Sequence, residues 1–150
     1  CLDHADVADR LLASGQGRSI AFCMKHFRGL DRHAIALRLI DSGDGLAVVL
    51  NLRDFSNIGH WELILRLVAK FDFASVCNGM PVWDSRVDHT AVAWLLLGNH
   101  GAPELSTYLH KFRGLDRSIA KALRKAGHGK AVRRNAASFQ KNWLHKLLSF

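Results

Sequence analysis

The sequence repeats itself at a nearly constant interval, and this feature constrains the fold more than any other. The six residues at 27–32, Phe-Arg-Gly-Leu-Asp-Arg, recur unchanged at 112–117, and weaker copies lie between them. Such a period is typical of repeat proteins, in which each repeat packs on its neighbours along the chain. Successive copies begin at steps of 28, 28, 29 and 28 residues, at Leu2, Leu30, Ile58, Val87 and Leu115. The chain therefore divides into repeats 2–29, 30–57, 58–86, 87–114 and 115–141, followed by a terminal segment, 142–150.

Each repeat opens with a signal for the start of a helix. The first apolar residue is followed by an aspartate in four repeats and by glycine in the third: Asp3, Asp31, Gly59, Asp88 and Asp116. An aspartate side chain at this point can accept hydrogen bonds from the unpaired amides of the first helical turn. Apolar residues then recur at the spacing of one helix face, which predicts a first helix of about 11 residues.

A turn and a second helix complete each repeat. Glycines bracket the turn in Gly15-Gln16-Gly17, Gly43-Asp44-Gly45 and Gly127-His128-Gly129, where they can take the left-handed conformation that ends a helix. The second helix has apolar residues spaced four and then three apart, and it ends in an aromatic residue each time. These closing residues are Phe27, Phe55, Trp83, Phe112 and Phe139. Gly29, Asn57 and Gly114 should stop this helix, and Gly79 with Pro81 should distort it in the third repeat.

Two helices of 10 to 11 residues cannot bury their apolar faces alone, whereas stacked pairs bury a continuous core. The expected fold is all-α: a single α-solenoid domain of about five two-helix repeats of 28 residues, with a C-terminal helix over 142–150. The chain opens on Cys1 rather than Met, so we expect it to be part of a longer protein.

Composition and motifs argue against several functional classes. The longest apolar run, 91–97, is far shorter than the ~20 residues that span a bilayer, so no membrane association is expected. Three distant cysteines form neither a zinc motif nor a disulfide framework, which favours an intracellular setting. His4, His60 and His89 share one repeat position, which indicates a common surface role rather than an active site. Because no catalytic or phosphate-loop motif is present, we expect no enzyme activity, metal or cofactor.

Positive charge is concentrated at the end of the chain. Residues 111–150 contain eleven lysines and arginines against the single Asp116, whereas residues 1–110 contain ten basic and twelve acidic residues. A field of this kind attracts phosphate backbones and acidic surfaces; a solubilising, solvated end face is the alternative. The predicted phosphate-binding residues are Arg18, Lys121, Arg124, Lys125, Lys130, Arg133 and Arg134.

The residue at the tip of the turn changes from repeat to repeat. Glutamine, aspartate and histidine can each pair with base edges, and in a solenoid the tips line up along one edge. The candidate base contacts are Gln16, Asp44, Asp72, His100 and His128. Unconstrained drift of loop residues is the alternative explanation.

The order of helix, glycine-bracketed tip, basic residue and second helix, as in Ala13-Ser14-Gly15-Gln16-Gly17-Arg18, resembles the repeats of TAL effectors and bacterial TAL-like DNA-binding proteins. In that family the loop residues face the major groove, each repeat reads one base, and the residues after the tip approach a phosphate. The resemblance covers residues 2–139 and implies a bacterial DNA-binding solenoid, in some cases an effector delivered to a eukaryotic host.

The sequence therefore predicts a non-enzymatic nucleic-acid-binding module, monomeric, with DNA favoured over RNA as partner. Phosphate contacts would come from the basic last repeat, and base contacts from the tips. The alternative is a protein-interaction solenoid, an effector or adaptor that binds an acidic partner. The expected location is cytoplasmic, or nuclear if the protein is delivered to a eukaryotic host.

Overall fold

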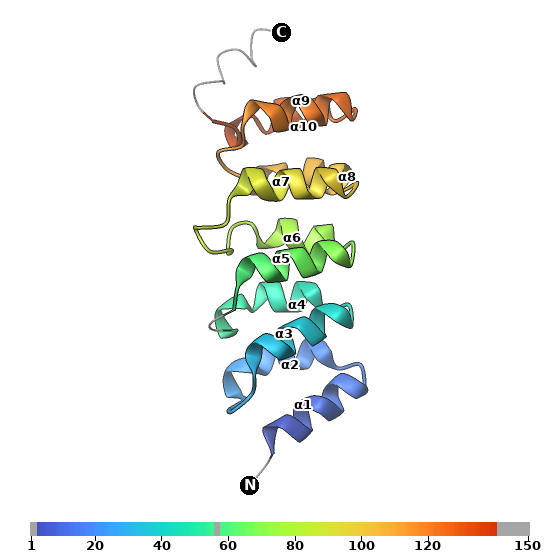
Figure 1. Cartoon of the computed structure of the whole chain (residues 1–150), viewed down its shortest axis with the longest axis vertical. Coiled ribbons are helices and arrows are strands. Elements are labelled where there is room, and N and C mark those ends of the chain that lie inside the picture. The colour runs from blue at the N-terminus through green and yellow to red at the C-terminus, as the bar shows by residue number, and fades with distance from the viewer. Residues whose placement is uncertain (1–2, 56–57, 141–150) are drawn as a thin grey trace. The chain divides into compact units, whose positions relative to one another are not determined.

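The computed structural model describes residues 3–55 and 58–140, and these residues confirm the all-α class (Figure 1). The described chain forms α-helices and short 3-10 helices, with one isolated parallel bridge between Leu115 and Phe139 in place of any strand. It divides into two compact units, which we call the N-terminal half, Cys1–Ser75, and the C-terminal half, Val76–Phe150. The predicted terminal helix at 142–150 and the stop at Asn57 lie outside the described residues.

The first helix of every repeat begins where the sequence predicts. These helices are α1 (His4–Ala13), α3 (Arg32–Asp41), α5 (His60–Ala69), α7 (His89–Gly98) and α9 (Arg117–Lys125). The four aspartates before them cap them: Asp3, Asp31 and Asp88 accept the N–H groups of Ala5, Ala34 and Thr90, and Asp116 accepts those of Ser118 and Ile119. Gly59 precedes α5 and provides no side-chain cap. The aspartate pattern therefore marked the helix starts correctly.

All five turns after the first helices close in the same way. One residue takes a positive φ, and the N–H of the next donates to the carbonyl five residues earlier, as in Gln16 to Leu11 at 2.8 Å. This pairing satisfies carbonyls that the helix end would otherwise leave unpaired. The positive-φ residues are Gly15, Gly43, Phe71, His100 and Gly127, with φ of 72°, 90°, 58°, 66° and 90°. The third and fourth repeats therefore form the turn without glycine at this position.

The second helices are shorter than predicted. They are α2 (Gly17–Cys23), α4 (Gly45–Leu50), α6 (Phe73–Gly79), α8 (Ala102–Thr107) and α10 (Gly129–Arg134). All but α6 continue into a 3-10 helix: η1 (Met24–His26), η2 (Leu52–Asp54), η3 (Leu109–Lys111) and η4 (Ala136–Ser138). The prediction of one continuous second helix of 10 to 11 residues is thus wrong, because the backbone changes from α-helical to 3-10 geometry after six or seven residues.

Asparagine residues stand at the point of this change in two repeats. The amides of Asn51 and Asn135 stand where the α-helix ends and donate to the carbonyls of Ala47 and Ala131, each at 2.9 Å. The same two carbonyls also accept the backbone N–H groups of Asn51 and Asn135, at 3.3 and 3.0 Å. In the third repeat, where Gly79 and Pro81 are expected to distort the second helix, α6 ends at Gly79.

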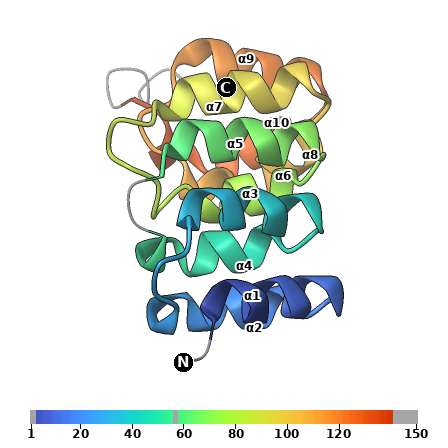
Figure 2. The ribbon, with the colours of Figure 1, turned by 60° about the horizontal axis from the view of Figure 1, so that its bottom comes forward.

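The apolar faces of the first and second helices together form the core. Among the apolar residues spaced four and then three apart on the second helices, which the sequence predicts to be buried, Phe27 and Ala136 are half-buried and the others are buried. In the N-terminal half α3 packs on α4 and α5, and α2 packs on α4; in the C-terminal half α7 packs on α8 and α9, and α10 packs on α9 and α8 (Figure 2). Within each half, neighbouring helix pairs therefore stack on one another.

The identical hexapeptides have a structural role. The N–H of Arg28 donates to Nδ1 of His4 at 2.8 Å, and the N–H of Arg113 donates to Nδ1 of His89 at 2.9 Å. Each imidazole also lies edge-on against the phenylalanine of its hexapeptide, with ring centroids 5.7 and 6.0 Å apart. At the same repeat position Arg32 donates instead to the carbonyl of Asp54 at 2.7 Å. This position therefore ties the end of a repeat to its own first helix.

Candidate nucleic-acid interface

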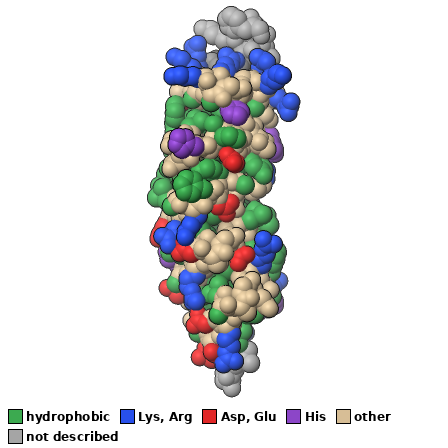
Figure 3. All heavy atoms as spheres, turned by 90° about the vertical axis from the view of Figure 1, so that its right-hand side faces the viewer, with side chains coloured by type: hydrophobic (Ala, Val, Ile, Leu, Met, Phe, Trp, Pro, Cys, Tyr) green, Lys and Arg blue, Asp and Glu red, His purple; other side chains and the backbone are tan. Residues whose placement is uncertain are grey.

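The two helices of the last repeat carry a dense set of exposed cations. On α9 they are spaced by four, three and one residues, opposite the buried Ile119 and Leu123, and on α10 they lie around the buried Val132. The buried residues hold the helices to the core and leave the charged faces in solvent. In Figure 3 Lys and Arg side chains gather in this part of the C-terminal half. The exposed cations are Arg117, Lys121, Arg124, Lys125, Lys130, Arg133 and Arg134.

None of these seven cations forms an ion pair with any residue in the described ranges. Asp116, the one acidic residue nearby in sequence, faces its own helix. Its carboxylate accepts the hydroxyl of Ser118 and the N–H groups of Ser118 and Ile119, at 2.8 and 3.2 Å for the amides. The bond from the Ser118 hydroxyl lowers the pKa of Asp116 most, the amides add to this, and partial burial opposes it. The carboxylate is thus committed to capping.

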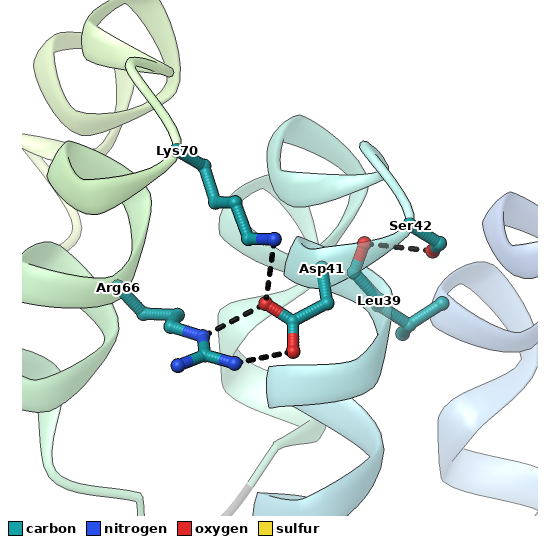
Figure 4. Close-up of polar contacts among 5 residues, drawn as sticks. All are labelled: Leu39, Asp41, Ser42, Arg66 and Lys70. Carbon is teal, nitrogen blue, oxygen red and sulfur yellow. Dashed lines mark hydrogen bonds and ion pairs between the residues drawn. The ribbon is translucent and has the colours of Figure 1, made fainter.

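Several cations of the N-terminal half are paired instead. Arg38 lies 2.6 Å from Asp9 on the preceding first helix, and Arg66 reaches Asp41 in the same manner through two bonds of 2.8 and 2.5 Å. Lys70 adds a third contact to Asp41 at 3.5 Å (Figure 4). The hydrogen bonds from Arg66 lower the pKa of Asp41 most, burial opposes them as the next largest effect, and the charges of Arg66 and Lys70 lower the pKa further.

The predicted loop-tip residues differ in exposure and in their partners. Gln16 is exposed, but Asp44 and Asp72 are half-buried and turn toward the preceding repeat, where a Cβ on Gly17 or Gly45 would collide with their carboxylates. The Asp44 carboxylate also accepts a hydrogen bond from Nε of Arg18 at 3.3 Å, and the Asp72 carboxylate accepts one from the N–H of Ser75 at 3.2 Å. These two carboxylates are used within the protein.

His100 is one residue out of register with the other tips. It holds the positive-φ position that glycine holds in three repeats, and Gly101 is the residue equivalent to Gln16. The prediction that His100 is a tip residue is wrong, because His100 takes the positive φ that ends the helix, a conformation that glycine takes in three other repeats. The fourth repeat therefore has no side chain at its tip. His128 is correctly placed and precedes α10 directly.

The predicted phosphate-binding residues fall into two groups. The six on α9 and α10 come together in the C-terminal half, where Lys130 and Arg134 also line an open groove of about 670 Å³. Arg18 belongs to the N-terminal half and pairs with Asp44, although 79% of its side chain stays exposed.

Neither a metal-binding cluster nor a reactive thiol at Cys77 is present in the described residues. No group of three or more His, Cys, Asp or Glu there lies close enough to hold a metal ion. Burial raises the pKa of the Cys77 thiol to about 12, with Glu104 adding to the shift and Lys111 opposing it. A thiol with such a pKa is protonated near neutrality and is a poor nucleophile.

No helix in the described segments is long and apolar enough to cross a bilayer.

Sequence reasoning missed an apolar surface on the second helices of the N-terminal half. Phe22 on α2 and Leu46 and Leu50 on α4 are exposed, Phe22 by 57% and Leu50 by 64%. Phe22 and Leu50 stand at the sixth position of their helices, off the spacing of the buried residues. That offset was the available signal, since an apolar residue outside the buried face of a short helix must meet solvent.

No protein-family model matches the chain, and no curated protein or solved structure was found to match it.

Proposed function

We propose that the protein is a non-enzymatic nucleic-acid-binding module whose α9–α10 pair contacts the phosphate backbone. The observation that carries this proposal is the set of seven exposed cations on α9 and α10 without acidic partners among the described residues. Lysine and arginine held near phosphates release condensed counterions, so unpaired cations on a rigid helix pair favour binding to a polyanion. DNA is the favoured partner, as the resemblance to TAL-like repeats suggests.

The proposal includes a solenoid arrangement of the five repeats. The shared caps, the shared helix-ending turns and the stacking of helix pairs within each half support it. Base contacts have a smaller part in the proposal than phosphate contacts, because Asp44 and Asp72 bind groups of the protein itself. Gln16 and His128 are the tips whose side chains stay available.

The test is the affinity of the chain for a mixed-sequence DNA duplex, and for a single-stranded RNA of the same length, over a series of salt concentrations. About five phosphate contacts would give a slope of about −4.5 in log K against log salt for the duplex. Changing Lys121, Arg124 and Lys125 together to alanine should make this slope shallower by about 2 to 3.

A matched control removes the same charge from the other half of the protein. Lys25, Arg28 and Arg53 are exposed and make no side-chain ion pair among the described residues, so their triple alanine variant should bind as the parent does. If both triple variants weaken binding equally, the interaction follows net charge alone and the proposed interface is wrong. Absence of binding to either nucleic acid at low salt would overturn the function itself.

A protein-interaction module is the second candidate function. The exposed Phe22, Leu46 and Leu50 favour it, because large exposed apolar side chains are typical of protein interfaces and contribute little to phosphate binding. An acidic protein partner would use the cations of α9 and α10 as well. Changing Phe22 and Leu50 to serine separates the two candidates, since it should abolish binding to a protein partner and leave DNA affinity unchanged.

A further inference from the structure

The groove beside α10 lies wholly within the C-terminal half. It is lined by residues of α8 and η3 on one side and by residues of α10 and the turn before it on the other. The helices α8 and α10 pack together. Its volume of about 670 Å³ falls within the range of small-ligand sites. A nucleotide is a ligand of suitable size for such a space.

Cationic and neutral polar groups line this groove. Lys130 and Arg134 stand one turn apart on α10 and so share a face, while His110 of η3 and His128 of the preceding turn approach it from two further segments. No acidic residue is among the described residues that line it. Four side chains that can donate hydrogen bonds and carry positive charge thus surround one volume.

These four donors are not used elsewhere in the described structure. The side chains of Lys130, Arg134, His110 and His128 make no hydrogen bond or ion pair with other described residues, whereas the hydroxyls of Ser106 and Thr107 donate to the carbonyl of Pro103 at 2.8 and 2.9 Å. The helix therefore satisfies the hydroxyls, and the four cationic or imidazole side chains are left for a ligand. Arginine suits a phosphate because its guanidinium can donate two parallel hydrogen bonds to two oxygens.

We propose that this groove seats one phosphate of a nucleic-acid backbone together with its attached nucleotide, with Lys130 and Arg134 as the phosphate ligands. The inference rests on the proposed function and names the place where the backbone is held. It distinguishes the two groove cations from the other exposed cations of α9 and α10, which face solvent and act through their charge.

The first experiment compares two double variants that remove equal charge. Lys130→Ala with Arg134→Ala should lower affinity for the DNA duplex at least 10-fold more than Lys125→Ala with Arg133→Ala, which removes the same charge from exposed residues outside the groove. Thermal unfolding of both variants shows whether the fold is kept, and exposed residues of this kind have little effect on stability. Equal losses would overturn the inference and leave the proposed function standing.

The second experiment uses a mononucleotide in place of DNA. Thymidine 5′-monophosphate, titrated to millimolar concentration, should shift the backbone amide NMR signals of Thr107, His110 and His128 in a saturable way, and thymidine without phosphate should not. The Lys130→Ala, Arg134→Ala variant should lose these shifts. No saturable shift would overturn the groove assignment; saturable shifts in a chain that fails to bind DNA or RNA would support the groove and refute the proposed function.

Discussion

The helix pairs α3–α4 and α9–α10 share one scaffold and present different surfaces. Both start from a capping aspartate, turn through a positive-φ glycine and bury an apolar face. At the second and sixth positions of the second helix, however, α4 has Leu46 and Leu50 where α10 has Lys130 and Arg134. Buried residues and turns set the backbone, and these two outward positions set what the surface can bind.

Charge pairing follows the same division. Asp41 at the end of α3 neutralises Arg66 and Lys70, whereas the cations of α9 and α10 have no acidic partner among the described residues. An exposed ion pair contributes little to stability, but it cancels the field that would attract a phosphate. Under the proposed function, this difference makes the α9–α10 pair better suited to a polyanion than the first helices that carry these ion pairs.

The largest expected effect tests whether the two scaffolds are equivalent. Phe55 and Phe112 close the second helices of their repeats and are 2% and 1% exposed, so each change to alanine should cost about 3 to 5 kcal/mol of unfolding free energy. Phe22→Ala is the control, since this exposed phenylalanine should cost less than about 0.5 kcal/mol. Chemical denaturation measures all three; a clearly smaller loss at one buried site would break the equivalence.

A second prediction concerns the first residue of the second helix, which is glycine in both pairs. A Cβ on Gly45 would lie 2.5 Å from Cδ2 of the buried Leu67, whereas a Cβ on Gly129 would meet Cγ of Arg124 at an ordinary 3.6 Å. Gly45→Ala should therefore destabilise by about 1 to 3 kcal/mol through overpacking. Gly129→Ala should be neutral or stabilise by up to about 1 kcal/mol, because alanine lowers the entropy of the unfolded chain. Equal effects in denaturation would show that the two turns pack alike.

The sequence predicted the all-α class, the aspartate caps and most of the core, because each depends on local chemistry at a fixed spacing. It failed where contacts between repeats decide the outcome. Nothing local shows that the carboxylates of Asp44 and Asp72 turn back over Gly17 and Gly45, and nothing local distinguishes His100 from a tip residue. Similarly, Lys130 and Lys125 look alike in sequence, and only the packing of α8 against α10 places the first of them in a groove.

The hydrogen bonds from the hexapeptides to His4 and His89 lead to a prediction of a smaller effect, the dependence of stability on pH. Burial lowers the pKa of His89 most, the charge of Arg113 adds to this, and Asp88 opposes it. The pKa of His89 in the folded protein lies below the unfolded value of about 6.5, so the unfolded state binds more protons as the pH falls. The contribution of His89 to the free energy of unfolding is therefore fully present above pH 6.5 and is lost as the pH falls through the folded pKa. Protonated Nδ1 can no longer accept the N–H of Arg113, a bond worth about 1 kcal/mol.

His89→Phe keeps an aromatic ring against Phe112 and removes the titration. The variant should be less stable than the parent at pH 7.5, and the difference should shrink by pH 5. Denaturation at both pH values measures this, and an NMR titration of the imidazole gives its pKa directly. A difference that stays constant with pH would mean that His89 stabilises the repeat by packing alone. His4→Phe removes the matching hydrogen bond from the N-terminal half and shows whether both contacts contribute equally at pH 7.5.

The smallest expected effect on stability turns the paired surface into an unpaired one. Asp9→Asn and Asp41→Asn together free Arg38, Arg66 and Lys70 from their ion pairs, and exposed pairs of this kind are worth about 0 to 1 kcal/mol each. If unpaired cations on a rigid helix pair are enough to attract nucleic acid, the variant should bind the DNA duplex more tightly, with a salt slope steeper by about 1 to 2. Unchanged affinity and slope, measured in a variant that unfolds like the parent, would mean that pairing does not explain the difference between the two surfaces. The groove lined by Lys130 and Arg134 would then be the feature that distinguishes the last repeat, because the first helices of the N-terminal half contribute no residue to it.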